Sequence, residues 1–257
     1  MPEIRIDGLK VNYFSIGDFN RSVPTVLLIH GACQSSWCWK FQIPFLKNYK
    51  KFNSIAIDLP GHGLSEGDGL TSISEYSDFI SKFIENLDLI DVILLGHSMG
   101  GRISQVLILD HPENVIGCIL AGTGARLRVT QATFRAIEKG FEYFAKTASI
   151  NSFSENASIE LREEFYNHLI NSNNVCCKND MIACNEFDVR DDISNIYLPA
   201  LIICGENDIL APVKYSKYLY ESIKGSTIKI IKNSGHFMML EKPGEFNSLL
   251  KKFLDII

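Results

Sequence analysis

One serine in this chain, flanked by glycines, has the clearest arrangement for chemistry. Residues 96–100 read GHSMG, which matches the GxSxG pattern of a nucleophile elbow centred on Ser98. The glycines allow a strand, a tight turn and a helix to pass close together, so that Ser98 takes a strained backbone conformation with its hydroxyl exposed. A hydroxyl presented in this way is a candidate nucleophile for attack on a carbonyl carbon.

A serine hydroxyl is a weak nucleophile at neutral pH, so Ser98 needs a base that is itself oriented by an acid. The chain order expected for this elbow is serine, acid, histidine, and Asp208 and His236 follow Ser98 in that order. His236 would accept the serine proton and pass it to the leaving group, while Asp208 would fix the histidine tautomer. Glu206 is the alternative acid. Asp208 is preferred because Glu206 lies nearer the end of the preceding apolar run.

The negative charge that develops on a carbonyl oxygen needs N–H donors that are already in place. The backbone N–H of Met99, directly after the nucleophile, is one predicted donor. The second is predicted at Ala32, in the loop that follows the apolar run at 24–30. We interpret His30 and His97 as residues that hold these loops in shape.

The candidate residues follow short apolar runs, which predicts a sheet whose strands end at one rim. Strands are expected at 24–30, 53–58, 91–95, 115–121, 198–205 and 226–231, after a hairpin of 4–6 and 11–16. Helical periodicity is found at 73–87, 102–109 and 246–256. Alternating strands and helices indicate an α/β fold with a mostly parallel sheet covered on both faces. Such sheets bind ligands at the carboxyl ends of their strands.

The segment from about 126 to 196 differs from the rest because it is aromatic and charged and has no apolar strand run. Its periodicity predicts helices, including 131–146 and 158–169.

These motifs occur together in a known superfamily. They are HG at 30–31, DLPGHGLS at 58–65, GHSMGG at 96–101, GEND at 205–208 and GHF at 235–237. Jointly they resemble the α/β-hydrolase superfamily, over nearly the whole chain outside the middle segment. The resemblance implies an eight-stranded sheet with an antiparallel second strand, a core domain at 1–124 and 197–257, and a helical cap at 125–196. It also implies a triad of Ser98, Asp208 and His236. The serine at the elbow is unlike the haloalkane dehalogenases and epoxide hydrolases, which carry aspartate there. The loop at 58–65 is similar to that of bacterial carboxylesterases.

Large aromatic and basic side chains near the predicted site are candidate substrate contacts. They are Trp37, Trp39, Arg126, Phe134, Phe141 and Phe237. Aromatic walls would suit an apolar acyl or aromatic group, and Arg126 or Arg128 could bind a substrate carboxylate. The same aromatic residues could instead pack the cap against the core.

Composition narrows the partners. The 257 residues carry a formal net charge of -5, so no overall positive field attracts nucleic acid or an anionic membrane. The N-terminal residues lack the pattern of a secretory signal, and no apolar stretch is long enough to span a bilayer, which predicts a cytoplasmic protein. Seven scattered cysteines favour reduced thiols over disulfides. No metal or cofactor motif is found, and we expect a monomer or homodimer.

The expected function is therefore hydrolysis of a small-molecule ester through an acyl-enzyme on Ser98, with no cofactor. Two alternatives remain open on the sequence. One is a thioester or carbon–carbon bond hydrolase that uses the same triad, and the other is a ligand receptor of this fold.

Overall fold

The computed structural model describes residues 3–15, 19–49, 51–126 and 128–257. Met1, Pro2 and Ile16, which enter the sequence analysis, lie outside these residues. Among the helices that are described, none is long and apolar enough to cross a membrane.

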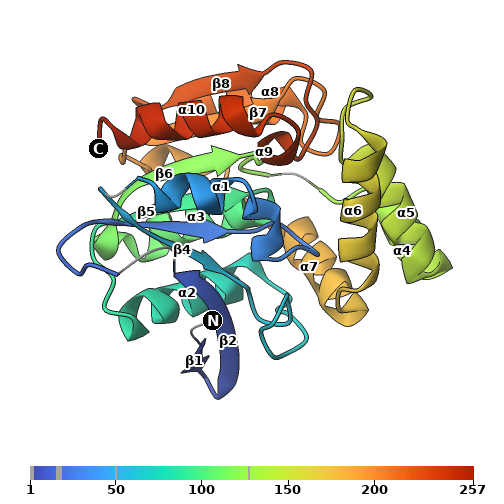
Figure 1. The fold of residues 1–257 in the computed structure, drawn as a ribbon, viewed down its shortest axis with the longest axis horizontal. Helices are drawn as coiled ribbons and strands as arrows, with labels where there is room; N and C mark the ends of the chain where they lie inside the picture. Colours follow the sequence, from blue (N-terminus) through green and yellow to red (C-terminus); the bar gives the residue numbers. More distant parts are fainter. Residues whose placement is uncertain (1–2, 16–18, 50, 127) are drawn as a thin grey trace.

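A single eight-stranded sheet forms the centre of the molecule (Figure 1). Its strands are β1 (Glu3–Ile6), β2 (Leu9–Ser15), β3 (Thr25–Ile29), β4 (Asn53–Ile57), β5 (Val92–His97), β6 (Val115–Ala121), β7 (Ala200–Gly205) and β8 (Thr227–Ile231). Their order across the sheet is β1-β2-β4-β3-β5-β6-β7-β8. β2 is antiparallel to both of its neighbours, and the pairs from β4 to β8 are parallel. The predicted α/β fold with an antiparallel second strand is thus confirmed.

The two-residue turn between β1 and β2 follows directly from the sequence. Asp7 and Gly8 both have positive φ angles, of 50° and 84°. A two-residue turn with positive φ at both positions matches the twist of a hairpin, and an Asp-Gly pair adopts it readily.

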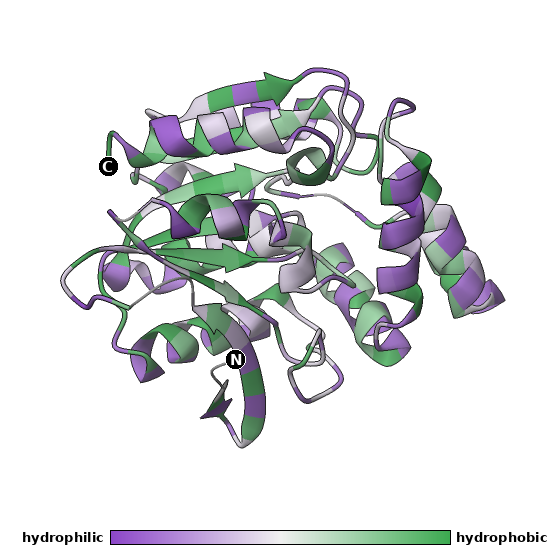
Figure 2. Cartoon of the chain, viewed as in Figure 1, coloured by the Kyte–Doolittle hydropathy of each residue, from purple (hydrophilic) through white to green (hydrophobic). Residues whose placement is uncertain are grey.

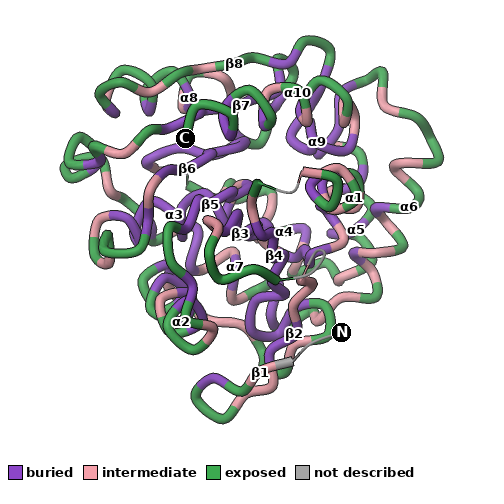
Figure 3. Tube along the Cα trace, turned by 60° about the vertical axis from the view of Figure 1, so that its left-hand side comes forward, coloured by how far each residue is buried: buried purple, intermediate pink, exposed green. Residues whose placement is uncertain are grey.

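Helices cover both faces of the sheet because successive side chains of each strand point to opposite sides. Val26 and Leu28 of β3 pack with one cluster of buried side chains, and Leu27 and Ile29 pack with the other. The helices of the first face are α1 (Gln42–Lys47) and α10 (Pro243–Leu254), and those of the second are α2 (Ile73–Asn86), α3 (Met99–Asp110) and α8 (Val213–Ser222). The central strands are accordingly apolar in Figure 2 and buried in Figure 3.

Four helices follow β6 and precede β7 in the sequence. In Figure 1 they lie on the side toward which the arrowheads of the parallel strands point. They are α4 (Gln131–Lys139), α5 (Phe141–Asn151), α6 (Ile159–Ile170) and α7 (Asn174–Glu186). The remaining short elements are α9 (Met238–Glu241) and the 3-10 helices η1 (Ser36–Trp39), η2 (Pro112–Asn114) and η3 (Ile193–Asn195).

The prediction of one helix over 131–146 is wrong. Gly140 has a φ of 127° and ends α4 before α5 begins. A residue in that conformation cannot continue a helix, and the apolar periodicity on either side of the glycine hides the interruption.

Replacing Gly100 should test how tightly α3 is packed on the sheet. A Cβ at Gly100 would lie 2.2 Å from the carbonyl oxygen of Ile29. We expect Gly100→Ala to lower the free energy of unfolding by about 3 kcal/mol or more, measured by urea denaturation. Gly244→Ala is the control, because a Cβ in that first turn of α10 would meet no atom within 4 Å. Equal midpoints for the two variants would contradict this account.

Candidate active site

Ser98 lies at the junction of β5 and α3 in a strained backbone conformation, with φ 52° and ψ -111°. The turn is tight because a Cβ at Gly96 would lie 2.4 Å from the carbonyl oxygen of Gly100. The Ser98 N–H donates to the carbonyl of Ala121 at 2.8 Å, and its own carbonyl accepts the Thr123 hydroxyl at 2.8 Å. Both hydrogen bonds come from the end of β6 and the loop after it, so the elbow is held from the neighbouring strand.

The structure brings His236 and Asp208 together. Asp208 Oδ2 accepts a hydrogen bond from His236 Nδ1 at 2.7 Å, and its Oδ1 accepts the backbone N–H groups of Leu210 and Ala211 at 2.9 and 2.8 Å. Burial raises the pKa of Asp208, but the charge and hydrogen bond of His236 and the two N–H groups outweigh it and hold the pKa below 3.8. Asp208 is therefore ionised at neutral pH, and it holds the His236 ring through Nδ1.

The rival acid, Glu206, lies elsewhere. Its side chain is exposed, and its carboxylate accepts the backbone N–H of Asn233 at 3.1 Å. Because Glu206 lies near the end of β7, its carboxylate binds the backbone of the loop that precedes His236.

Ser98 and His236 line one cavity of about 350 Å³, together with Ala32. Its apolar walls come mainly from the helices between β6 and β7 and from the loop after β7. They include Ala136, Phe144, Ala148, Phe165, Leu169, Met181, Ile209 and Leu210. The residues from α5 recur at 144, 147, 148 and 151, the spacing of one helix face.

The two predicted oxyanion donors differ from their neighbours in the loops that carry them. The next N–H groups after Ala32 are engaged, because Cys33 donates to Asp180 at 2.7 Å and Gln34 to the carbonyl of Gly31 at 3.3 Å. Within the described residues, the N–H groups of Ala32 and Met99 make no such hydrogen bond. Both are therefore available to a substrate oxygen.

Two buried histidines, His30 and His97, are neutral and form hydrogen bonds with the loops around this site. His30 Nδ1 donates to the Gly31 carbonyl at 2.8 Å, and its Nε2 accepts the Leu59 N–H at 3.0 Å. His97 Nε2 donates to the His236 carbonyl at 3.0 Å. Burial lowers the pKa of both histidines to about 3. His97 is thus a neutral ring whose centroid lies 4.7 Å from that of His236.

Of the six predicted substrate contacts, Phe237 lines the cavity. Trp37 instead stacks on His168, with ring centroids 4.6 Å apart, and Trp39 is fully buried beside Phe246. Both tryptophans belong to η1, where they pack against α6 and α10. The expectation that they face the substrate is therefore corrected.

Three predicted contacts from the middle segment also lie away from the cavity lining. Arg126 forms an ion pair with Asp188. Phe141 stacks on Phe144, and it is Phe144 that lines the cavity. Phe134 lies on a part of α4 that does not line the cavity. The rotation of each helix about its axis decides which side chains face inward, and a list of aromatic residues does not contain that information.

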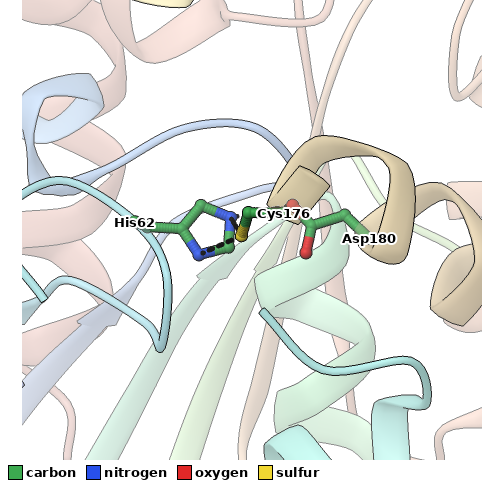
Figure 4. Close-up of side chains that lie close together, drawn as sticks. All are labelled: His62, Cys176 and Asp180. Carbon is green, nitrogen blue, oxygen red and sulfur yellow. Dashed lines mark hydrogen bonds and ion pairs between the residues drawn. The ribbon is translucent and has the colours of Figure 1, made fainter. Parts of the chain in front are cut away.

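Apart from Ser98, Asp208 and His236, the side chains of His62, Cys176 and Asp180 form a second buried polar cluster (Figure 4). His62 Nε2 lies 2.8 Å from Asp180 Oδ2, and His62 Nδ1 lies 3.0 Å from the carbonyl of Pro60. Because a carbonyl and a carboxylate both accept, each ring nitrogen must carry a proton. Burial lowers the pKa of His62, but the Asp180 charge and hydrogen bond prevail and raise it well above 6.5. The two residues form a buried ion pair.

The Asp180 carboxylate joins three parts of the chain. Besides His62, it accepts the Tyr76 hydroxyl of α2 at 2.7 Å and the Cys33 N–H of the oxyanion loop at 2.7 Å. Asp180 itself belongs to α7. It therefore ties a helix of the inserted segment to the loop that carries Ala32.

The same cluster offers possible metal ligands, because donor atoms of His62, Cys176 and Asp180 all lie within 4.8 Å of one another. Cys176 Sγ lies 3.4 Å from both ring nitrogens of His62, which places the sulfur over the ring face and off the axes of the nitrogen lone pairs. A metal ion needs those lone pairs, and the two ring protons occupy them. The hydrogen bonds thus favour an ion pair. The sequence analysis missed this grouping because His62 and Asp180 are 118 positions apart.

The fold and the elbow are those of an α/β hydrolase, and the model of the alpha/beta hydrolase family matches residues 26–249. The chain belongs to this family. The 3-oxoadipate enol-lactonase 2 of Acinetobacter baylyi is 27% identical to it over 261 residues, which cover 95% of this chain and 94% of the lactonase.

Solved structures give the same picture. A thermophilic esterase is 31% identical, with a TM-score of 0.86 and coverage of 99% of this chain and 96% of the esterase. Est816, described as an N-acyl homoserine lactone degrading enzyme, is 26% identical, with a TM-score of 0.85 and coverage of 98% and 100%.

The buried ion pair leads to a stability prediction. Asp180→Asn leaves the His62 cation buried without its counter-charge and should lower the free energy of unfolding by about 3–5 kcal/mol. Asp188→Asn removes partly exposed ion pairs with Arg126 and Arg190 and should cost only about 1 kcal/mol. Urea denaturation of both variants and the wild type measures these differences. A loss as small as that of the control would refute the proposed ion pair.

The pH dependence of this loss follows from the raised pKa of His62. In the wild type, the stabilisation from the pair is complete below the ordinary value of 6.5 and is lost as pH rises through the folded-state pKa. The gap between the wild type and Asp180→Asn should therefore narrow on the alkaline side. Urea midpoints measured from neutral to alkaline pH check this, and a gap that widens would contradict it.

Proposed function

We propose that this α/β hydrolase is a serine hydrolase that cleaves carboxylic esters through an acyl-enzyme on Ser98. The observation that carries the proposal is the joint placement of a strained elbow serine and a histidine bound to a buried carboxylate around one cavity. These are the groups that acyl transfer requires, in the roles of nucleophile, base and orienting acid.

In the first half-reaction, Ser98 Oγ attacks the ester carbonyl carbon while His236 Nε2 accepts its proton. The tetrahedral oxyanion is bound by the N–H groups of Ala32 and Met99. The intermediate then collapses, the C–O bond to the alcohol breaks, and the imidazolium donates its proton to the leaving alkoxide. Ser98 is left as an ester of the substrate's acid.

In the second half-reaction, His236 deprotonates a water molecule that attacks the acyl carbon. Collapse of this second intermediate returns the proton to Ser98 and releases the carboxylic acid. Asp208 stabilises the imidazolium in both steps, because its carboxylate remains ionised at 2.7 Å from Nδ1.

The size and lining of the cavity are consistent with a small or medium acyl or aromatic substrate. Its volume of about 350 Å³ lies at the lower end of ordinary ligand sites, and its walls include Phe144, Phe165 and Leu169. The likeness to an esterase agrees with this proposal. Two other relatives are named for lactone chemistry, and a lactone is a cyclic ester that the same attack would open.

The nucleophile is tested with p-nitrophenyl esters from acetate to long chains. Ser98→Ala should lower kcat at least about 10⁴-fold, because the acyl-enzyme cannot form. Ser74→Ala, an exposed serine of α2, is the matched control and should keep the wild-type rate. Mass spectrometry after reaction with an organophosphonate should place the adduct on Ser98. Absence of turnover by the folded wild type would favour a thioester, a carbon–carbon bond substrate or a receptor function.

The acid is tested separately. Asp208→Asn should lower kcat by about 10⁴-fold, since the amide favours the wrong histidine tautomer and carries no charge. Glu206→Gln should retain kcat within a few-fold, because Glu206 is exposed and bonds only the loop backbone. A larger loss in Glu206→Gln than in Asp208→Asn would reverse the assignment. Initial rates at saturating ester measure both.

A further inference from the structure

Arg102 lines the same cavity as Ser98, although the mechanism above does not use it. It belongs to α3, four residues after Ser98, and its backbone N–H donates to the Ser98 carbonyl at 3.2 Å. Ser98 is the N-cap residue of α3, so Arg102 lies in the first turn of the helix that begins at the elbow. Arg102 is only 4% exposed. A permanent positive charge is thus buried one helical turn from the nucleophile.

The guanidinium is incompletely satisfied. Nη1 donates to the carbonyl of Cys184 at 2.8 Å, and the guanidinium carbon lies 5.6 Å from the ring centroid of Phe187. Nε is buried and has no hydrogen-bond partner among the residues that the structure describes. An arginine carries five N–H donors and cannot lose its charge at physiological pH. Its contacts therefore leave donor capacity and a full charge uncompensated.

The carboxylates of α7 and of the segment that follows it form ion pairs with other cations. Asp180, one turn before Cys184 on α7, pairs with His62, and Asp188 pairs with Arg126 and Arg190. Among the described residues, Arg102 forms no ion pair. A buried charge without a counter-charge is costly, so its presence calls for a negative partner from outside the chain.

The rest of the cavity has the same polarity. Arg128 is exposed and also lines it, whereas no described lining residue is an aspartate or a glutamate. A mostly apolar cavity that is lined by two arginines and by no acid among the described residues is suited to an anionic ligand.

We propose that Arg102, assisted by Arg128, binds a carboxylate of the substrate, so that the enzyme acts on esters that carry a second, free carboxylate. The proposal rests on the ester hydrolysis proposed above. The planar guanidinium can pair with a carboxylate through two parallel N–H···O bonds. Because Arg102 is one turn from Ser98, the free carboxylate lies a few bonds from the ester carbonyl.

The test compares two substrates of equal chain length that differ only at one end. Monoethyl glutarate ends in a carboxylate, and ethyl valerate ends in a methyl group. The wild type should have a kcat/KM at least about 10-fold higher for monoethyl glutarate, measured by titration of the released acid. A wild type that favours ethyl valerate overturns the proposal without requiring any variant.

Substitution then assigns the preference to Arg102. Arg102→Met removes the charge and keeps an apolar side chain, so the ratio of the two kcat/KM values should fall about 10- to 100-fold, the range for hydrogen bonds to a charged group. Arg102→Lys should retain part of the ratio, since it keeps the charge but loses the fork. Arg190→Met, an exposed arginine paired with Asp188, is the control and should keep the ratio.

A purely structural function of Arg102 gives a different result. In that case Arg102→Met lowers both kcat/KM values equally and leaves their ratio unchanged, which overturns the proposal.

Binding separates this proposal from the ester hydrolysis on which it rests. Calorimetric titration of glutarate into Ser98→Ala should show binding that weakens at least about 10-fold when Arg102→Met is added. Glutarate binding without turnover of any ester supports the anion site and contradicts the proposed function. Turnover of ethyl valerate that depends on Ser98, without glutarate binding or half-ester preference, supports the function and overturns the anion site.

Discussion

The close crossing of β5, the elbow and α3 is the constraint on which the rest of the structure depends. A Cβ at Gly96 or Gly100 would come within 2.4 Å of backbone atoms, so the two backbones meet only because these positions have no side chain. The crossing holds Ser98 at a φ of 52°, at the carboxyl end of a central strand. The same end of the parallel strands also carries Ala32, Asp208 and His236. A local backbone constraint therefore sets the place where distant loops meet.

Burial gives neighbouring histidines different protonation states, and each state depends on what the ring nitrogens face. His30 and His97 each donate to a carbonyl and have no carboxylate partner, and burial keeps them neutral. His62 faces a carbonyl and a carboxylate and is a cation. His236 donates to the Asp208 carboxylate through Nδ1. The groups that face His30, His97 and His62 thus decide whether each buried ring is neutral or charged.

α7 links the inserted helices to the site through charge. Asp180 holds the oxyanion loop through the Cys33 N–H, and the carbonyl of Cys184, one turn later, accepts a hydrogen bond from Arg102. The carboxylate and the guanidinium have different partners, because His62 already neutralises Asp180. This division leaves Arg102 as the uncompensated charge in a mostly apolar cavity. The helix that closes the cavity thereby also influences its polarity.

The sequence by itself determined the alternation of strands and helices, the Asp7-Gly8 hairpin, the elbow at Ser98, and the order of serine, acid and histidine. These features depend on local backbone preferences and on side-chain periodicity, which a sequence displays directly. Only the tertiary structure decided which side chains face the cavity. Trp39 and Arg126 point elsewhere, Phe144 and Arg102 line the wall, and His62 meets Asp180 across 118 residues. Helix rotation and long-range pairing decide these contacts, and both arise from the packing of whole elements against one another.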